Sequence, residues 1–295
     1  MPGPSSPTLR RWELGAALRR IRESQEKTIE QVSHDLSELY GVGFSPAKIS
    51  RLENAKRGVN PRDVRDLCEY YGVAAAERDR LMQLAKASRE HDRWVGIPEG
   101  YATFVALESI ASRERGYESM FVPGLLQTPE YSRVIEGVGL PGLDQDSQTP
   151  ERIAARVSLR DQRQQRLRSA DPLELHLVVD ENVLRRVAGG AEVMRAQLEY
   201  LIEVSRLPNV ILQAMPIASG LYAGSEASTY VLLDFPEGEA MPDDVCYVEG
   251  ILGTMWVERD ADLRRINRVY NYLQIAALSP AGTRDFIASI IRETA

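Results

Sequence analysis

The 295-residue chain contains 36 Lys and Arg against 43 Asp and Glu, a formal net charge of −7, and 43% of its residues are hydrophobic. This length suits two domains, and no hydrophobic run approaches the roughly 20 residues that a membrane-spanning helix needs. The two cysteines, Cys68 and Cys246, lie far apart, which argues against a disulfide framework and favours a reducing cytoplasm with both thiols buried as small apolar side chains.

The charge is divided unevenly along the chain. Residues 1–65 carry 12 Lys and Arg against 8 Asp and Glu, whereas the remaining 230 residues carry 24 against 35. This asymmetry is expected when one domain binds phosphate groups and the other does not. The first residues lack the hydrophobic segment of a signal peptide, so residues 1–8 are predicted to form a disordered tail.

Five short helices are predicted after this tail. Thr28 and Gln31 form a T-x-x-Q capping box, which is typical of a helix start. Ser45-Pro46 and Asn60-Pro61 each combine a favoured N-cap residue with a proline, which is tolerated at the first helical position. The predicted helices cover residues 9–24, 29–40, 45–57, 62–71 and 75–90, and they form a compact all-α domain at residues 9–88.

The third predicted helix, residues 45–57, has the properties of a helix that reads DNA. Ile49 and Leu52 are spaced to face the other helices, which leaves small and polar residues at the N-terminal end, where such helices meet base edges. Arg51 is suited to a bidentate contact with guanine, worth about 1–3 kcal/mol of discrimination. The alternative is a solvated, charged helix in a protein-binding bundle.

This interpretation predicts two sets of DNA contacts. Backbone N–H groups at the start of the second helix, and cations around the third, are suited to phosphate. The predicted base contacts are Ser45, Pro46, Ala47, Ser50 and Arg51. The predicted phosphate contacts are Thr28, Lys48, Asn54, Lys56, Arg57 and Arg62.

The segments LGAALRRIRES, TIEQVSHDL and SPAKISRLENAKRGVNPRDVRDLCEYYGV resemble the phage-repressor-like (Xre/Cro-type) helix-turn-helix family. The resemblance implies a structural ion pair between Arg22 in the first helix and Glu53 in the third. Ser33 stands where the family usually has alanine and is still small enough for close packing. The connection SELYGVGF is longer than the family's short turn, so either the second helix runs on for an extra turn or a small loop follows it.

From about residue 90 the pattern changes to alternating helices and strands. After a linker at residues 89–100, this alternation predicts an α+β domain at residues 101–295. Strands are predicted in YESMFV, LELHLVVD, NVILQAMP, ASTYVLLDF and DVCYVEG. Helices are predicted after the linker in DRWVGIPEGYATFVALESIASRERG, and in TPEYSRVIEG, PERIAARVSLRDQRQQRLRS, EVMRAQLEYLIEVSR, ADLRRINRVYNYLQIAAL and AGTRDFIASIIRE.

Residues 95–290 resemble the C-terminal domain of actinobacterial regulators of the WhiJ-like, antitoxin-like class. The resemblance is clearest in VPGLLQTPEY and DENVLRR. It implies a transcription regulator that is often associated with a small acidic partner protein of the BldB-like type. It does not identify a small-molecule effector.

Several motifs of this half have a structural explanation beside a functional one. VPGLLQT is interpreted as a packing corner, with a ligand or partner pocket as the alternative. Asp180-Glu181 is interpreted as a helix N-terminus rather than an acid–base pair. GVGLPG, residues 137–142, follows a helix instead of a strand and therefore does not predict nucleotide binding. The arginines of residues 152–168 are interpreted as a solvated face, with a dimer, acidic-partner or RNA surface as alternatives.

The sequence therefore predicts a cytoplasmic, nucleoid-associated transcriptional regulator and not an enzyme. Its third helix reads the major groove, and its C-terminal domain dimerises and senses a small protein or ligand. His34, His91 and His176 have no partners at metal-ligand spacing, and neither a metal nor a cofactor is predicted. One alternative is an antitoxin-like module that sequesters a small protein, with DNA binding secondary. The other is an enzyme in the C-terminal domain, for which the sequence offers no assembled polar cluster.

Overall fold

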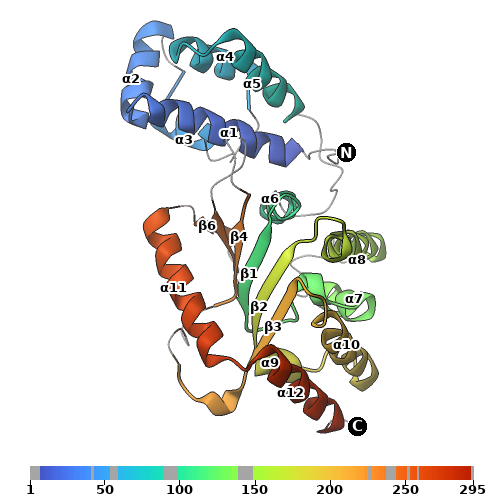
Figure 1. Ribbon diagram of the computed structural model, residues 1–295. Coiled ribbons are helices and arrows are strands. Elements are labelled where there is room, and N and C mark those ends of the chain that lie inside the picture. Colours follow the sequence, from blue (N-terminus) through green and yellow to red (C-terminus); the bar gives the residue numbers. More distant parts are fainter. Residues whose placement is uncertain are drawn as a thin grey trace. The chain divides into compact units, whose positions relative to one another are not determined.

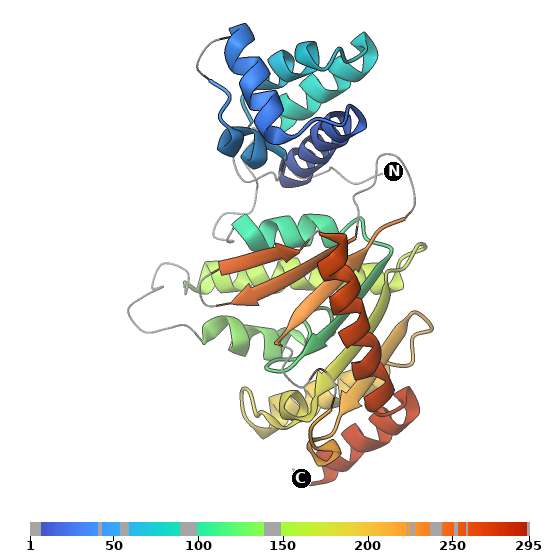
Figure 2. The same ribbon diagram turned by 90° about the vertical axis from the view of Figure 1, so that its left-hand side faces the viewer.

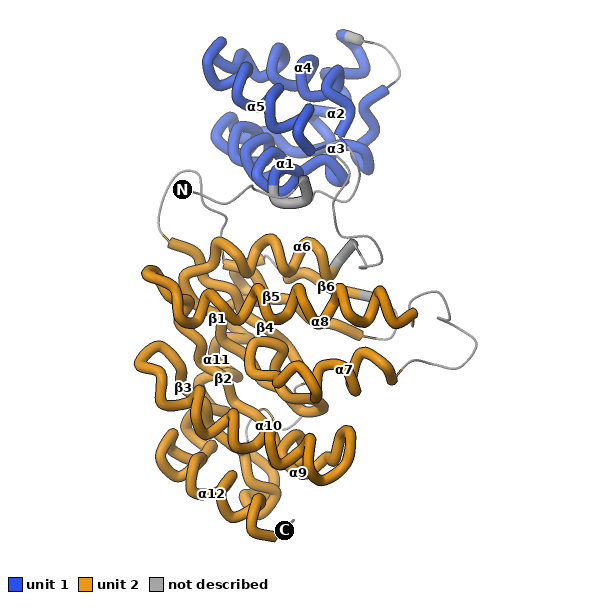
Figure 3. Tube along the Cα trace, turned by 90° about the vertical axis from the view of Figure 1, so that its right-hand side faces the viewer, with its two compact units in different colours: residues 1–95, 237–242 blue, residues 96–236, 243–295 orange. Residues whose placement is uncertain are grey.

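The computed structural model describes residues 7–40, 43–53, 59–88, 99–138, 149–222, 224, 228–236, 244–250, 253–257 and 259–293. The chain divides into two compact units, which Figure 3 colours separately. The described residues of unit 1 lie between 7 and 88, and those of unit 2 start at residue 99. None of the helices in these ranges is both long and apolar enough to cross a membrane.

Five helices make up the described part of unit 1 (Figure 1), as the sequence predicts. They are α1 (Pro7–Ser24), α2 (Ile29–Tyr40), α3 (Pro46–Glu53), α4 (Pro61–Tyr70) and α5 (Ala75–Ala87). The capping box at α2 is reciprocal, because the Thr28 N–H donates to Gln31 Oε1 at 2.8 Å and the Gln31 N–H donates to Thr28 Oγ1 at 3.2 Å. At α4, Asn60 Oδ1 accepts a bond from the Arg62 N–H at 3.1 Å. The local polar pattern therefore starts these helices as expected.

One apolar core joins the five helices of unit 1. Its fully buried side chains include Leu14, Leu18, Val32, Leu36, Ile49, Val64, Leu67 and Leu81. The long connection between the second and third helices is partly absorbed by α2, which runs on to Tyr40. Phe44 is buried in the core, and its carbonyl accepts a hydrogen bond from the Ser33 hydroxyl at 2.5 Å. This bond ties the chain just before α3 to the middle of α2.

Unit 2 is built on a sheet of six strands among the described residues, in the order β3-β2-β1-β4-β5-β6. β1, β2 and β3 pair in parallel, whereas β4, β5 and β6 continue the sheet antiparallel from the other edge of β1. The strands are β1 (Arg113–Glu118), β2 (Glu174–Asp180), β3 (Val210–Met215), β4 (Tyr230–Asp234), β5 (Val245–Gly250) and β6 (Gly253–Val257). The sheet therefore changes from parallel to antiparallel pairing at β1.

Helices cover both faces of this sheet. α11 lies along one face, and α6, α7, α8 and α10 lie on the other (Figures 1 and 2). The α11 face is apolar, with Tyr117, Leu232 and Cys246 of the sheet packed against Tyr270 and Leu273 of the helix. The helices are α6 (Glu99–Glu108), α7 (Pro129–Gly137), α8 (Pro150–Gln164), α9 (Glu181–Arg185), α10 (Ala191–Val204), α11 (Asp260–Ala276) and α12 (Pro280–Glu293), with 3-10 turns η1 (Gly124–Leu126), η3 (Gln165–Arg168) and η4 (Ile217–Ser219).

Two strands differ from the sequence prediction. The first strand is Arg113–Glu118 rather than YESMFV, and β6 is not predicted at all. The charged residues of β1 make it hard to recognise as a strand from the sequence alone. In the fold, each arginine of β1 pairs with an acidic residue on a neighbouring strand. The Arg115 guanidinium donates to both carboxylate oxygens of Asp234 on β4, at 2.7 and 2.5 Å. The Arg113 Nε donates to Glu174 on β2 at 2.8 Å.

Candidate functional site

α3 has one buried face and one accessible face. Ile49 and Leu52 are buried in the core of unit 1. The accessible face carries all five predicted base-contact residues, since Ser45, Pro46, Ala47 and Arg51 are exposed and Ser50 is partly exposed. The N-terminal end of α3 thus presents a hydroxyl, small apolar groups and one guanidinium to solvent.

The C-terminal end of α3 is held in place by a buried ion pair. Arg22 Nε donates to Glu53 Oε1 at 2.7 Å, and Arg22 Nη2 donates to Glu53 Oε2 at 2.9 Å. Arg22 Nη1 also donates to the Lys27 carbonyl at 2.8 Å. The hydrogen bonds to Glu53 raise the pKa of Arg22, so the guanidinium stays charged inside the unit. Arg22 therefore links α1, the turn before α2 and the end of α3.

The predicted phosphate contacts divide into three groups. Thr28 and Arg62 are exposed at the first turns of α2 and α4. The Lys48 ammonium is engaged within unit 1, donating to Asp63 Oδ1 at 2.8 Å and to the Gly43 carbonyl at 2.8 Å. This pairing competes with the predicted phosphate contact of Lys48. The remaining three, Asn54, Lys56 and Arg57, lie outside the described residues.

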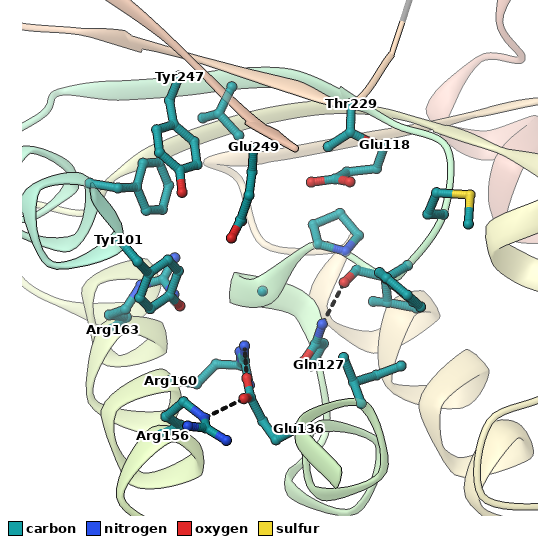
Figure 4. Close-up of a pocket in the computed structure, with 18 of the residues that line it drawn as sticks. Tyr101, Glu118, Gln127, Glu136, Arg156, Arg160, Arg163, Thr229, Tyr247 and Glu249 are labelled. Atoms are coloured by element: carbon teal, nitrogen blue, oxygen red, sulfur yellow. Dashed lines mark hydrogen bonds and ion pairs between the residues drawn. The ribbon is translucent and has the colours of Figure 1, made fainter. Parts of the chain in front are cut away.

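Unit 2 contains a cavity of about 660 Å³ between the sheet and α7 and α8 (Figure 4). Residues 122–124 and Gln127 of VPGLLQT line this cavity, whereas Leu125 and Leu126 are buried. The segment is therefore a packing corner and a pocket wall at once. Sequence reasoning offers these two roles as alternatives, because the wall forms only when distant strands and helices come together.

Three of the four arginines of α8 are placed differently from the sequence interpretation. Arg156, Arg160 and Arg163 do not form a solvated face; they are largely buried and line the cavity. Arg156 Nε and Arg160 Nη2 both donate to Glu136 of α7, at 2.5 and 2.7 Å. Arg163 forms a forked pair with Glu108 of α6, with two bonds from its Nε at 3.0 and 2.9 Å. Helical spacing places these three side chains on the inward face of an otherwise polar helix.

Three carboxyl groups of the sheet face the same cavity. Burial raises the pKa of Glu118 to about 8; a hydrogen bond with Thr229 opposes this shift and the nearby charge of Glu249 adds to it. Burial also raises the pKa of Glu249 and, aided by Glu108, that of Glu114 well above its usual value. Glu118 stays partly accessible because its carboxyl faces the cavity, although protein surrounds it. The side chain of Glu249 is exposed to solvent, although enough protein surrounds its carboxyl group to raise its pKa.

The other candidate residues from the sequence analysis have structural roles, or lie outside the described residues. Asp180 caps α9, accepting from the Asn182 N–H at 2.9 Å, and Glu181 Oε2 accepts from the Ile217 N–H at 2.8 Å. Both cysteines are free and buried. Within the described ranges, no three His, Cys, Asp or Glu side chains gather where they could hold a metal ion. Most of GVGLPG, and His91, lie outside the described residues.

Two family models match the chain. One, described as a helix-turn-helix domain, matches residues 13–81 and takes in α2 and α3. The other, described as a domain of unknown function (DUF5753), matches residues 101–289 and takes in every residue that lines the cavity. No curated protein and no solved structure matches the chain.

Proposed function

Because the chain belongs to the family defined by the domain of unknown function DUF5753 and carries a helix-turn-helix domain before it, we propose that it is a sequence-specific, non-catalytic transcriptional regulator. A helix-turn-helix domain suggests DNA binding. The observation that carries the proposal is the division of α3, with Ile49 and Leu52 buried while Arg51 and the residues at its N-terminal end are accessible. This division suits insertion of the first turn of α3 into a major groove.

The proposal assigns different tasks to the two units. Unit 1 acts as an Xre/Cro-type reader of base sequence, and unit 2 acts as a WhiJ-like regulatory domain that dimerises and senses a partner or ligand in the cytoplasm. A dimer is proposed because one helix-turn-helix reads few base pairs. Two-fold symmetry then places the two recognition helices about one DNA turn, roughly 34 Å, apart. The operator is expected to be an inverted repeat with that half-site spacing.

The test begins with selection of bound fragments from random DNA by the full chain at physiological salt. Binding of the selected duplex and of a scrambled duplex is then measured by fluorescence anisotropy over a salt series. Arg51→Ala is expected to weaken the selected duplex by about tenfold or more and to reduce its advantage over the scrambled one. Arg62→Ala and Lys56→Ala are expected to weaken both duplexes alike and to lower the salt slope by about 1 each.

The control is Lys86→Ala, which removes an exposed cation from α5, a helix outside the α2–α3 motif. It is expected to leave both affinities and the salt slope close to those of the unaltered chain. Failure of the selection to enrich any sequence would contradict the proposal. Equal losses on both duplexes for Arg51→Ala would contradict the assignment of α3 as the reading helix.

A further inference from the structure

The cavity of unit 2 combines features of a ligand site. Its volume of about 660 Å³ lies within the usual range for sites that take small molecules, roughly 300–1,000 Å³. Three buried side-chain atoms on its walls have no hydrogen-bond partner among the described residues: Glu114 Oε2, Gln127 Oε1 and Arg160 Nε. Buried polar groups are normally satisfied, so three such groups around one cavity indicate a missing partner.

The strand register brings two of the carboxyl groups into one row. Tyr117 pairs with Tyr230 and Val231 pairs with Tyr247, so Glu118, Thr229 and Glu249 lie side by side across three strands. The Cα atoms of Glu118 and Glu249 are thus two strand spacings apart, roughly 10 Å. Both carboxyl groups project into the cavity (Figure 4). A positively charged group between them could be contacted from both sides.

The charges around the cavity favour a cation. Four carboxyl groups line the cavity, those of Glu114, Glu118, Glu136 and Glu249, together with the guanidinium groups of Arg156, Arg160 and Arg163; a fifth carboxyl group, that of Glu108, pairs with Arg163. The arginines are already engaged, because Glu136 accepts from two of them and Glu108 from the third. Glu114, Glu118 and Glu249 form no ion pair among the described residues. The three guanidinium groups are already paired with carboxylates, so they offer an anionic ligand no unpaired cation, whereas an ammonium group would stabilise the ionised forms of Glu118 and Glu249.

The edge of the cavity is apolar. Met120, Phe121 and Val138 line it with 47%, 42% and 74% of their surface exposed. Large hydrophobic side chains left exposed beside a polar cavity are typical of a binding site. Deeper in, Phe104 stacks on Tyr247 with ring centroids 4.6 Å apart. These walls suit an apolar or aromatic body joined to the cation.

We propose that this cavity binds a small organic amine, with its ammonium group between Glu118 and Glu249 and its apolar body against Phe121 and Met120. This deepens the sensing role proposed for unit 2 and names the chemical class of its ligand. Binding changes the protonation of the site. Because the pKa of Glu118 is about 8, this carboxyl is mostly neutral at pH 7 and releases its proton when an ammonium group arrives.

The test uses three probes that share one body and differ in charge: 2-phenylethylamine, 2-phenylethanol and 3-phenylpropionate. Binding to the full chain without DNA is measured by ligand-observed NMR and titration calorimetry. A ligand of about nine heavy atoms is expected to bind with a dissociation constant of about 10 mM or tighter. The amine is expected to bind at least about tenfold more tightly than the alcohol, and its affinity to rise from pH 6.5 towards pH 9.

Glu118→Gln with Glu249→Gln is expected to remove both the preference for the amine and the rise with pH. The control is Glu203→Gln, which removes the same charge from the exposed surface of α10; it is expected to change neither. Binding of the alcohol or the acid as tightly as the amine, retention of the preference in the double variant, or no binding of the amine would each overturn the proposal. None of these results depends on DNA, so they leave the proposed DNA binding untouched.

Discussion

The ion pair between Arg22 and Glu53 offers a strong test of how unit 1 holds its recognition helix. Only 10% of the Arg22 side chain and 5% of the Glu53 side chain are exposed. Glu53→Gln keeps the shape of the side chain but removes its charge. The guanidinium of Arg22 then keeps as acceptors the Lys27 carbonyl, the weakly held Glu23 carboxylate 3.4 Å away and the neutral amide oxygen of the new side chain, but it has lost its buried counter-charge.

The expected cost follows from this burial. Removing one partner of a buried pair destabilises a protein by about 3–5 kcal/mol, because an uncompensated charge stays buried. A small domain has a total stability of about 5–15 kcal/mol, so the loss is a large part of it. Since each 1.4 kcal/mol is about a tenfold change, protection of α1 and α3 amides against hydrogen exchange is expected to fall about 100-fold or more.

Hydrogen exchange of the full chain, resolved by mass spectrometry, separates unit 1 from unit 2. The matched control is Glu38→Gln, which removes a carboxylate from the exposed His34–Glu38 pair on α2 and is expected to have little effect. Arg22→Met combined with Glu53→Gln removes both charges and is expected to be better protected than Glu53→Gln alone. If Glu53→Gln matched Glu38→Gln, or if the double variant were worse than the single one, the buried charge would not be the cause.

Three further predictions concern packing and titration. Gly15→Ala is expected to destabilise unit 1 by about 1–3 kcal/mol, since a Cβ there would lie 2.5 Å from the Glu53 carbonyl oxygen; slower exchange in α1 would contradict this. Burial raises the pKa of Cys68 to about 11 and that of Cys246 to about 12, so both thiols are expected to resist a thiol reagent at pH 8 until the chain unfolds. The raised pKa of Glu118 means that the folded state holds a proton which the unfolded state releases between pH 4.5 and about 8. The free energy of unfolding is therefore expected to fall as pH rises through this window, and denaturant titrations should show a smaller fall in Glu118→Gln.

The helical unit could be predicted closely because its signals are local. Each of α2 and α4 starts at a capping residue three or fewer positions from its partner, and the capping bonds form as the sequence indicates. The same holds for the inward positions of α3, where Ile49 and Leu52 are buried. β1 is less predictable because its stabilising partners, Asp234 and Glu174, lie far away in sequence. Without knowledge of the strand order, Arg-Glu-Arg does not have the pattern of a strand in the middle of a sheet.

The cavity could not be predicted from local sequence patterns, because its residues come from segments that lie far apart in the sequence. Residues 150–164 show a helix rich in arginine, and such helices usually have a solvated face. Whether Arg160 faces water or protein depends on Glu136, which is 24 residues away on another helix. Glu118 and Glu249 come together only through the pairing of β1, β4 and β5, and nothing near either residue in the sequence indicates the other. A site assembled from single residues of many elements leaves no motif, so the fold has to be known before its chemistry can be inferred.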